Sequence, residues 1–210
     1  LLDLDHDGDQ DLVIGTFHGL IFMQNDGAGK FSPVTGKLTP AGQIYGLAAA
    51  DYDDDGDLDL YVCCYAPRPA HVVGRFMARP VPFHDANNGG RNLFFRNDRN
   101  WNFKDVTREV GLDENNSRFS FAATWEDYDN DGDMDLYVAN DYGRNCLYEN
   151  DGAGRFRDVA PQLGVEDQAT GMSVSWSDYN NDGWMDLYVA NMWSSAGKRI
   201  TDKAAFRADA

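Results

Sequence analysis

The sequence predicts an all-β fold, a β-propeller fragment of four-stranded antiparallel blades, and three repeated features carry this prediction. One acidic loop of the pattern D-x-[DN]-x-D-G-x-x-D occurs four times along the chain. A hairpin turn that begins Asn-Asp and ends in Phe occurs three times. An apolar run rich in β-branched and aromatic residues follows each acidic loop, as is typical of a strand covered on both faces.

The acidic loops, named loop one to loop four, place oxygen-bearing side chains at loop positions 1, 3, 5 and 9. They lie at residues 3–11, 51–59, 127–135 and 178–186. A hard cation such as Ca²⁺ binds about six to eight oxygen ligands, so a loop that alternates carboxylates and turns at a glycine can enclose one. An EF-hand is excluded because position 12 is apolar in all four copies. The sequence thus predicts up to four Ca²⁺ ions, with solvated acidic turns as the alternative.

The charge of the chain is concentrated in these loops. The formal net charge is −17, and the loops hold five, six, five and three aspartates. Carboxylates packed this closely repel one another unless a cation neutralises them. A chain of this charge is not expected to bind nucleic acid, and it has no apolar run of about 18 residues that would predict a membrane span.

The elements of each repeat follow one order: strand, acidic loop, strand, strand, hairpin turn, strand. The hairpin turns lie at 24–31, 96–103 and 149–156. The four blades then have three, four, four and two strands, so we expect the parent protein to continue in both directions. A linear β-solenoid is the alternative, but its repeats would recur more often. We expect blades at 1–43, 44–117 (with an insertion at 66–91), 118–168 and 169–210.

Three stretches carry a resemblance to a known family. DYDNDGDMDLYVAN (127–140) and NDGAGRFRDVA (150–160) resemble FG-GAP/VCBS-type repeats, the blades of integrin-α-like propellers. DYNNDGWMDLYVANMWSSAGKRI (178–200) is similar to the propellers of the ASPIC/UnbV family. The resemblance covers essentially the whole chain. It implies a secreted or cell-surface propeller, usually seven-bladed, with Ca²⁺ in the acidic loops.

The same resemblance implies the cation ligands position by position. The implied side-chain ligands are Asp3, Asp5, Asp7 and Asp11; Asp51, Asp53, Asp55 and Asp59; Asp127, Asp129, Asp131 and Asp135; and Asp178, Asn180, Asp182 and Asp186. The implied backbone carbonyl ligands, at position 7, are those of Asp9, Asp57, Asp133 and Trp184. Because loop four has Asn180 in place of Asp, we expect it to bind Ca²⁺ most weakly.

The chain also departs from the family. The literal Phe-Gly and Gly-Ala-Pro signatures are absent, so integrin-type ligand binding is not expected. No nucleophile with a neighbouring base can be recognised, and the paired aspartates are already assigned to cations. The sequence therefore favours a scaffold or a binding and adhesion module over an enzyme. The alternative is a propeller lyase or hydrolase that acts on acidic polysaccharide.

The insertion at 66–91 is a break in composition, with four Pro, four Arg, two His and one acidic residue. Such a basic flap could bind an anionic ligand, for example a uronate or a sulfated glycan. The candidate contacts are Arg68, Arg75, Arg79 and Arg91. The alternative is a flap that covers a neighbouring blade. A protein or a glycan is the expected kind of partner.

Four tryptophans and one histidine complete the candidates. We expect four exposed tryptophan rings that could stack on sugars: Trp101, Trp125, Trp176 and Trp193. Trp125 and Trp176 occupy the same place before their loops, which favours repeated core packing instead. His6, at position 4 of loop one, is expected to point to solvent.

The three cysteines favour no disulfide. Cys63 and Cys64 are neighbours in a predicted strand and must point to opposite faces, and Cys146 makes the count odd. We expect all three to be small buried residues rather than disulfide partners or metal ligands.

Overall fold

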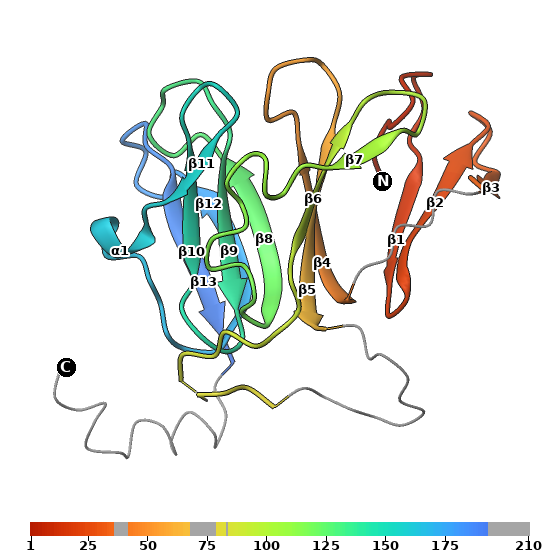
Figure 1. Cartoon of the computed structure of the whole chain (residues 1–210). Coiled ribbons are helices and arrows are strands. Elements are labelled where there is room, and N and C mark those ends of the chain that lie inside the picture. Colours follow the sequence, from red (N-terminus) through yellow and green to blue (C-terminus); the bar gives the residue numbers. More distant parts are fainter. Residues whose placement is uncertain (36–41, 68–78, 83, 193–210) are drawn as a thin grey trace, which may run out of the picture.

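The computed structural model describes residues 1–35, 42–67, 79–82 and 84–192 (Figure 1). Within these ranges the chain forms thirteen strands and one short helix. The strands make four antiparallel sheets of three, four, four and two strands. The all-β prediction and the predicted number of strands in each blade are therefore confirmed for the described residues.

The sheets follow the sequence without crossovers. The first sheet contains β1 (Leu12–Thr16), β2 (Gly19–Asn25) and β3 (Phe31–Pro33). The second contains β4 (Gln43–Ala50), β5 (Asp59–Ala66), β6 (Leu93–Asn97) and β7 (Phe103–Asp105). The third contains β8 (Ser120–Glu126), β9 (Asp135–Asn140), β10 (Cys146–Asn150) and β11 (Phe156–Asp158). Helix α1 (Ala160–Leu163) precedes the fourth sheet, β12 (Gly171–Ser177) and β13 (Asp186–Asn191).

The sheets stand face to face along an arc (Figure 1). Neighbouring sheets meet mainly along the first strand of each, because β4 contacts β8 and β8 contacts β12. Sheets that meet at their first strands and diverge toward their last strands have the arrangement of propeller blades. The acidic loops connect first to second strands, so all of them lie along one edge of the arc, the upper edge in Figure 1.

The first sheet keeps only a trace of a first strand. Leu2 forms an isolated antiparallel bridge with Asp11, in the place that Ala50 takes beside Asp59 in the second sheet. Loop one is therefore closed at its base by a residue pair equivalent to the one below loop two. This closure gives loop one the same framework as the complete repeats.

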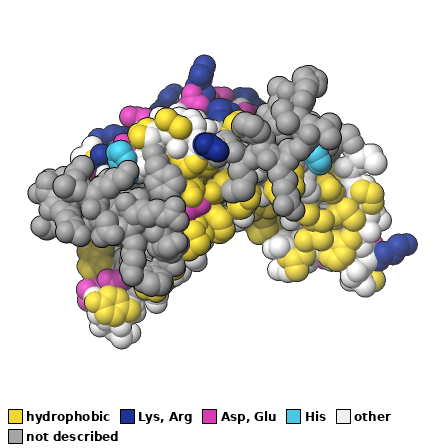
Figure 2. Space-filling model, turned by 90° about the horizontal axis from the view of Figure 1, so that it is seen from below, with side chains coloured by type: hydrophobic (Ala, Val, Ile, Leu, Met, Phe, Trp, Pro, Cys, Tyr) yellow, Lys and Arg dark blue, Asp and Glu magenta, His cyan; other side chains and the backbone are white. Residues whose placement is uncertain are grey.

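The core lies between the sheets and uses equivalent positions at each interface. Tyr61 and Tyr137, which follow loops two and three by the same distance, are fully buried by the next sheet along the arc. Tyr188, their equivalent in β13, is 68% exposed. In the first sheet, Ile14 and Ile21 are exposed on the opposite face. Figure 2 shows hydrophobic side chains gathered at the end of the arc that holds β1–β3.

The described part of the insertion packs on the third sheet. Asp85 forms an ion pair with Arg118, which lies just before β8, and Ala86 is buried in a cluster with Phe119. Gly89 lies so close to the backbone of Phe119 that a Cβ atom there would come within 2.4 Å of its amide nitrogen. Residues 84–91 thus cover a neighbouring sheet, as the alternative interpretation of the insertion expected.

The cysteines are buried and unpaired, as predicted. Cys63 lies in the core between the second and third sheets, whereas Cys64 lies in the core between the first and second. Burial raises the pKa of the Cys64 thiol to about 11, so this thiol stays protonated and unreactive at neutral pH.

Candidate metal centre

The acidic loops share one backbone conformation. The residue at position 4 has a positive φ in every loop, and so does the glycine at position 6; in loop two these are Asp54, with φ 54°, and Gly56, with φ 88°. The carboxylate at position 1 stabilises this turn, since Asp51 accepts hydrogen bonds from the N–H groups of Asp55 and Gly56 at 3.1 and 2.9 Å. The sharp turn predicted at the glycine is therefore present.

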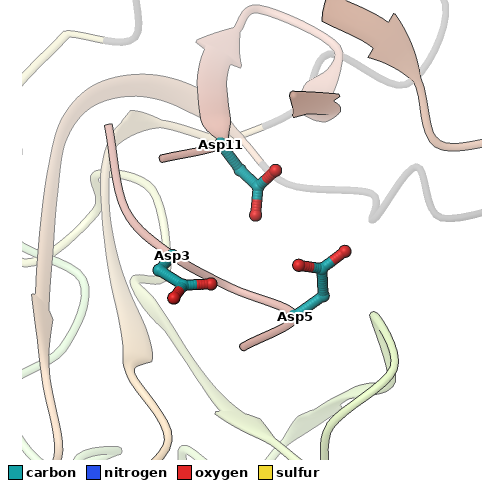
Figure 3. A group of neighbouring side chains, drawn as sticks. All are labelled: Asp3, Asp5 and Asp11. Carbon is teal, nitrogen blue, oxygen red and sulfur yellow. The ribbon is translucent and has the colours of Figure 1, made fainter. Parts of the chain in front are cut away.

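Three carboxylates converge in each of the first three loops, from positions 1, 3 and 9. Each supplies one oxygen, and the three oxygens lie within 4.8 Å of one another. The groups are Asp3, Asp5 and Asp11; Asp51, Asp53 and Asp59; and Asp127, Asp129 and Asp135. Figure 3 shows the carboxylates of the first group turned toward a common space. Each such group can hold a metal ion.

Position 5 lies outside these groups. In loop one the Oδ1 atom of Asp7 accepts the N–H of Asp9 at 3.1 Å, and Asp55 accepts the N–H of Asp57 at 2.9 Å in loop two. The structure therefore brings together three of the four predicted carboxylates in each of loops one to three. Ligation by position 5 and by the position 7 carbonyls stays a prediction.

Loop one contains oxygens that lack a protein partner. The Oδ1 atoms of Asp3 and Asp5 are buried and accept no hydrogen bond within the described residues. A buried carboxylate oxygen without a donor carries a substantial desolvation cost. Burial, followed by the nearby charges of Asp11 and Asp7, raises the pKa of Asp5. A cation in the common space would satisfy both oxygens, so the residues present fit a bound metal ion.

The position 9 carboxylates are the most buried members. Asp59 accepts hydrogen bonds from the N–H of Tyr52 at 3.3 Å and from the N–H of Asn97 at 2.8 Å. Asp135 has equivalent bonds from Tyr128 and Asn150. Burial nevertheless dominates and raises the pKa of Asp59 and of Asp135 to about 7. A nearby divalent cation would favour the charged form of both.

The asparagine of each hairpin turn is a part of the site that sequence reasoning missed. Asn25, Asn97 and Asn150 each donate their backbone N–H to the position 9 carboxylate of their own sheet, at 3.0, 2.8 and 2.8 Å. The repeated Asn was visible in the sequence, but it was interpreted only as a turn residue. Its nearly constant distance from the start of the acidic loop, 22 residues in the first repeat and 23 in the third, was the available signal.

One prediction about a side chain near loop one was wrong. Trp101 is not an exposed ring: it is 8% exposed, and its indole N–H donates to Oδ2 of Asp5 at 3.1 Å. His6 is exposed, as predicted, but its Nε2 also lies 2.6 Å from Oδ1 of Asp57 in loop two. Both contacts arise because the next sheet places its loop and hairpin directly over loop one.

Two of the other predicted tryptophans pack on the core rather than over loop one. Trp125 and Trp176 are partly buried and pack on the cores beside β8 and β12, as favoured by their equivalent positions. Trp193 lies outside the described residues.

Loop four has the same turn as the other loops, but its position 9 carboxylate is less buried. Asp178 accepts the N–H groups of Asp182 and Gly183, and Asp186 accepts that of Tyr179, as in the other loops. Asp186 is only half-buried, whereas its equivalents in loops one to three are buried. The side chain of Trp184 at position 7 is exposed.

The candidate arginine contacts are only partly described. Arg68 and Arg75 lie outside the described residues, and Arg79 is exposed. Arg91 is held by two carboxylates, since its Nε donates to Asp113 at 3.1 Å and its Nη1 to Asp105 at 3.3 Å. Arg91 is therefore already neutralised, so Arg79 is the stronger candidate for contact with an anionic ligand among the described arginines of the insertion.

Among the described residues, no helix has the length and apolar character needed to cross a membrane.

Comparison with known proteins identifies the repeats. The family described as FG-GAP-like repeat matches residues 3–62 and 127–189. Cartilage acidic protein 1 of Xenopus tropicalis is 24% identical over 255 residues, a match that covers 91% of this chain and 39% of that protein. The human protein of the same name is 23% identical and is covered over 38% of its length. The chain thus spans about two-fifths of these relatives.

A solved structure also aligns with the chain. It is an Agrocybe aegerita lectin described for specific recognition of non-reducing terminal N-acetylglucosamine. The TM-score is 0.47 and the sequence identity 17%, over 87% of this chain and 44% of the lectin.

Proposed function

The chain belongs to the FG-GAP-like repeat family, and from this premise we propose that it is a calcium-stabilised extracellular propeller module that acts as a scaffold or binding unit. The observation that carries the proposal is the threefold recurrence of converging carboxylates from positions 1, 3 and 9. Three carboxylates in one loop are a typical oxygen donor set for Ca²⁺, which accepts irregular geometry and additional carbonyl or water ligands.

The calcium ions would have a structural role. Each would neutralise carboxylates that otherwise repel, and each would fix a loop between the first two strands of a blade. A ligand that binds only the folded state stabilises it by mass action, by about 2.7 kcal/mol for each site at a calcium concentration 100 times the Kd. Extracellular calcium modules work at a Kd of about 10⁻⁴ to 10⁻³ M, which fits a secreted or cell-surface protein.

Thermal unfolding with and without a chelator tests this role. We expect saturating Ca²⁺ to raise the Tm by about 10 °C over the value in EDTA, because several sites contribute. The control is Mg²⁺ at the same concentration, which prefers a smaller octahedral site and should raise the Tm less. Equal Tm values in Ca²⁺ and in EDTA would contradict the proposal.

The partner of the module is proposed to be a protein or a glycan. Arg79 is an exposed cation in the described part of the insertion, whereas the exposed Arg91 is held by Asp105 and Asp113. An anionic glycan is the ligand whose chemistry Arg79 fits. Arg79→Glu should weaken binding to a sulfated glycan array, and Arg108→Glu, a charge reversal at an arginine outside the insertion, serves as the matched control. Equal binding by both variants would show that Arg79 of the insertion does not contact the glycan.

A further inference from the structure

The hairpin asparagines connect acidic loops of different sheets. Asn97 belongs to the second sheet, yet its side-chain amide donates to the backbone carbonyl of Leu4 in loop one at 3.1 Å. The N–H of Leu4, in turn, donates to the position 9 carboxylate of loop one, Asp11, at 3.0 Å. Because the backbone N–H of Asn97 donates to Asp59 at 2.8 Å, a single residue joins the carboxylate groups of loops one and two.

The same connection recurs one sheet further along. The side-chain amide of Asn150 donates to the carbonyl of Tyr52 in loop two at 3.0 Å, and its backbone N–H donates to Asp135 of loop three at 2.8 Å. The N–H of Tyr52 donates to Asp59. A series of hydrogen bonds, joined through the backbones of Leu4 and Tyr52 and through the two asparagines, therefore runs from Asp11 through Asp59 to Asp135.

Both connecting asparagines are shielded from water. Asn97 is fully buried and Asn150 is 2% exposed. Water cannot readily replace their hydrogen bonds, and in a low-dielectric interior such bonds are stronger and polarise one another. A shift of a position 9 carboxylate is therefore passed to the backbone of the preceding loop rather than absorbed by solvent.

Asn25 offers an internal contrast. It occupies the same hairpin position in the first sheet and also donates its N–H to a position 9 carboxylate. Its side-chain amide, however, donates to the carbonyl of Gln10 in loop one, within its own sheet, at 3.1 Å. Asn25 thus shares the local contacts of the other two asparagines but connects no pair of loops.

Building on the proposed calcium sites, we propose that Asn97 and Asn150 are positioning residues that couple neighbouring sites, so that calcium in one loop raises the affinity of the loop before it. An ion held by Asp59 fixes that carboxylate and with it the hairpin backbone at Asn97. The Asn97 amide then holds the backbone carbonyl of Leu4, and the backbone N–H of Leu4 holds the Asp11 carboxylate. The coupling is reciprocal by thermodynamic necessity.

Trp101 allows loop one to be followed separately. Its indole N–H contacts Asp5, so its fluorescence should change when calcium fills loop one. The part of the calcium-dependent signal that disappears in Trp101→Phe reports this loop. Asp53→Ala weakens loop two without touching the hydrogen bonds of Asn97, and Asn97→Ala changes no charge.

We expect the effect of Asp53→Ala on calcium binding by loop one to depend on whether Asn97 is present. In the otherwise unchanged protein, Asp53→Ala raises the calcium concentration that half-saturates the Trp101 signal by about threefold to tenfold, the worth of one or two hydrogen bonds. In the Asn97→Ala background the same change shifts it less than about twofold. In the Asn25→Ala background the full shift persists. Equal shifts in all three backgrounds, or no shift in the first, overturn the coupling.

Hydrogen exchange in EDTA gives a second readout that needs no calcium. Asn150→Ala should speed amide exchange in loop two, residues 51–59, by about threefold or more, whereas Asn25→Ala should leave loop two unchanged. Unchanged exchange in Asn150→Ala contradicts the connection between loops. If calcium binds but Asp53→Ala has the same effect with and without Asn97→Ala, only the proposed coupling is contradicted. If no variant binds calcium, the proposed function and the coupling are both contradicted.

Discussion

The two junctions between neighbouring acidic loops have the same backbone arrangement but differ in the charge of their side chains. At the first junction, between loops one and two, Asp57 pairs with His6 at 2.6 Å and with Arg99 at 2.7 Å. At the second junction, between loops two and three, the equivalent of Asp57 is Asp133. There Asp54 stands in place of His6, and Gly152 stands in place of Arg99.

The electrostatic consequence is opposite at the two junctions. The guanidinium of Arg99 donates a hydrogen bond to Asp57, which is buried, and the imidazole of His6 lies beside the same carboxylate. At the second junction Asp133 has acidic neighbours instead, and its pKa is raised by burial, by Asp131 and by Asp54. The first junction is thus partly neutralised by its own side chains, whereas the second would depend on the proposed calcium ions. One repeat fold therefore tolerates two ways to balance the same charge.

The largest effect should come from the feature that both junctions share, the position 9 carboxylates. The pKa of Asp59 and of Asp135 is raised to about 7, so the folded state binds these protons more tightly than the unfolded state does. Their contribution to stability is complete below about pH 4 and is lost as the pH rises through 7. In EDTA we expect the Tm to fall by about 5–10 °C between pH 5 and pH 8.

The control for this pH dependence is the double variant Asp59→Asn with Asp135→Asn, which should flatten it. Calcium should flatten it as well, because a cation competes with the protons. A chelated protein whose Tm rises from pH 5 to pH 8 would show that these carboxylates are not protonated in the folded state.

The next effect should separate the two junctions. Asp57→Asn removes the partner of Arg99 and His6, so in EDTA we expect it to lower the free energy of unfolding by about 1–2 kcal/mol. Asp133→Asn removes one of several mutually repelling carboxylates and should leave the Tm unchanged or raise it. Paired melting curves of the two variants make the comparison. If both variants lower the Tm equally, the junctions do not differ in charge balance.

A smaller effect is expected from exchanging the hairpin residues. Arg99→Gly restores the residue found at the equivalent positions 27 and 152, and should cost about 0.2–1 kcal/mol in EDTA because the Arg99 side chain is largely exposed. The reciprocal Gly152→Arg brings a cation to Asp133, but the φ of 73° at Gly152 and the 2.8 Å approach of a new Cβ atom to the Asp133 carboxylate oppose this gain, so we expect a smaller net effect. High salt should reduce both effects, and salt-independent effects would point to backbone strain instead.

The smallest effect concerns the ring above loop one. Trp101→Phe keeps the contact with Phe22 but removes the hydrogen bond to Asp5. We expect loop one to bind calcium about threefold more weakly, with loops two and three unchanged. Site-resolved titration by NMR measures this, and a loss spread evenly over all loops would argue against a local role for Trp101.

The repeat itself could be predicted from sequence because its signals are local. The spacing of aspartates and glycine defines the loop, and runs such as LYVA after Asp135 define buried strands; both are present in the structure. Contacts between blades were not predictable in the same way. Asn97 and Leu4 are 93 residues apart, and only the stacking of one sheet on the next brings them together.

Two positions could not be interpreted fully from the sequence. Trp101 occupies a hairpin position that is glycine in the other repeats, at 29 and 154, so its ring was assigned to the surface although the fold directs it onto loop one. Position 5 was expected to ligate together with positions 1, 3 and 9. Its carboxylate lies outside the three converging groups and accepts the N–H of position 7, as in Asp55, so its ligation stays a prediction. Composition at a position does not reveal which way a side chain turns.

Calorimetric titration of the chelator-treated protein with Ca²⁺ counts the bound ions. We expect loops one to three to bind Ca²⁺, loop four to bind about tenfold more weakly, and Asp129→Ala to remove one of the three stronger sites. Absence of measurable binding, or a stoichiometry that Asp129→Ala leaves unchanged, would contradict the proposed calcium sites.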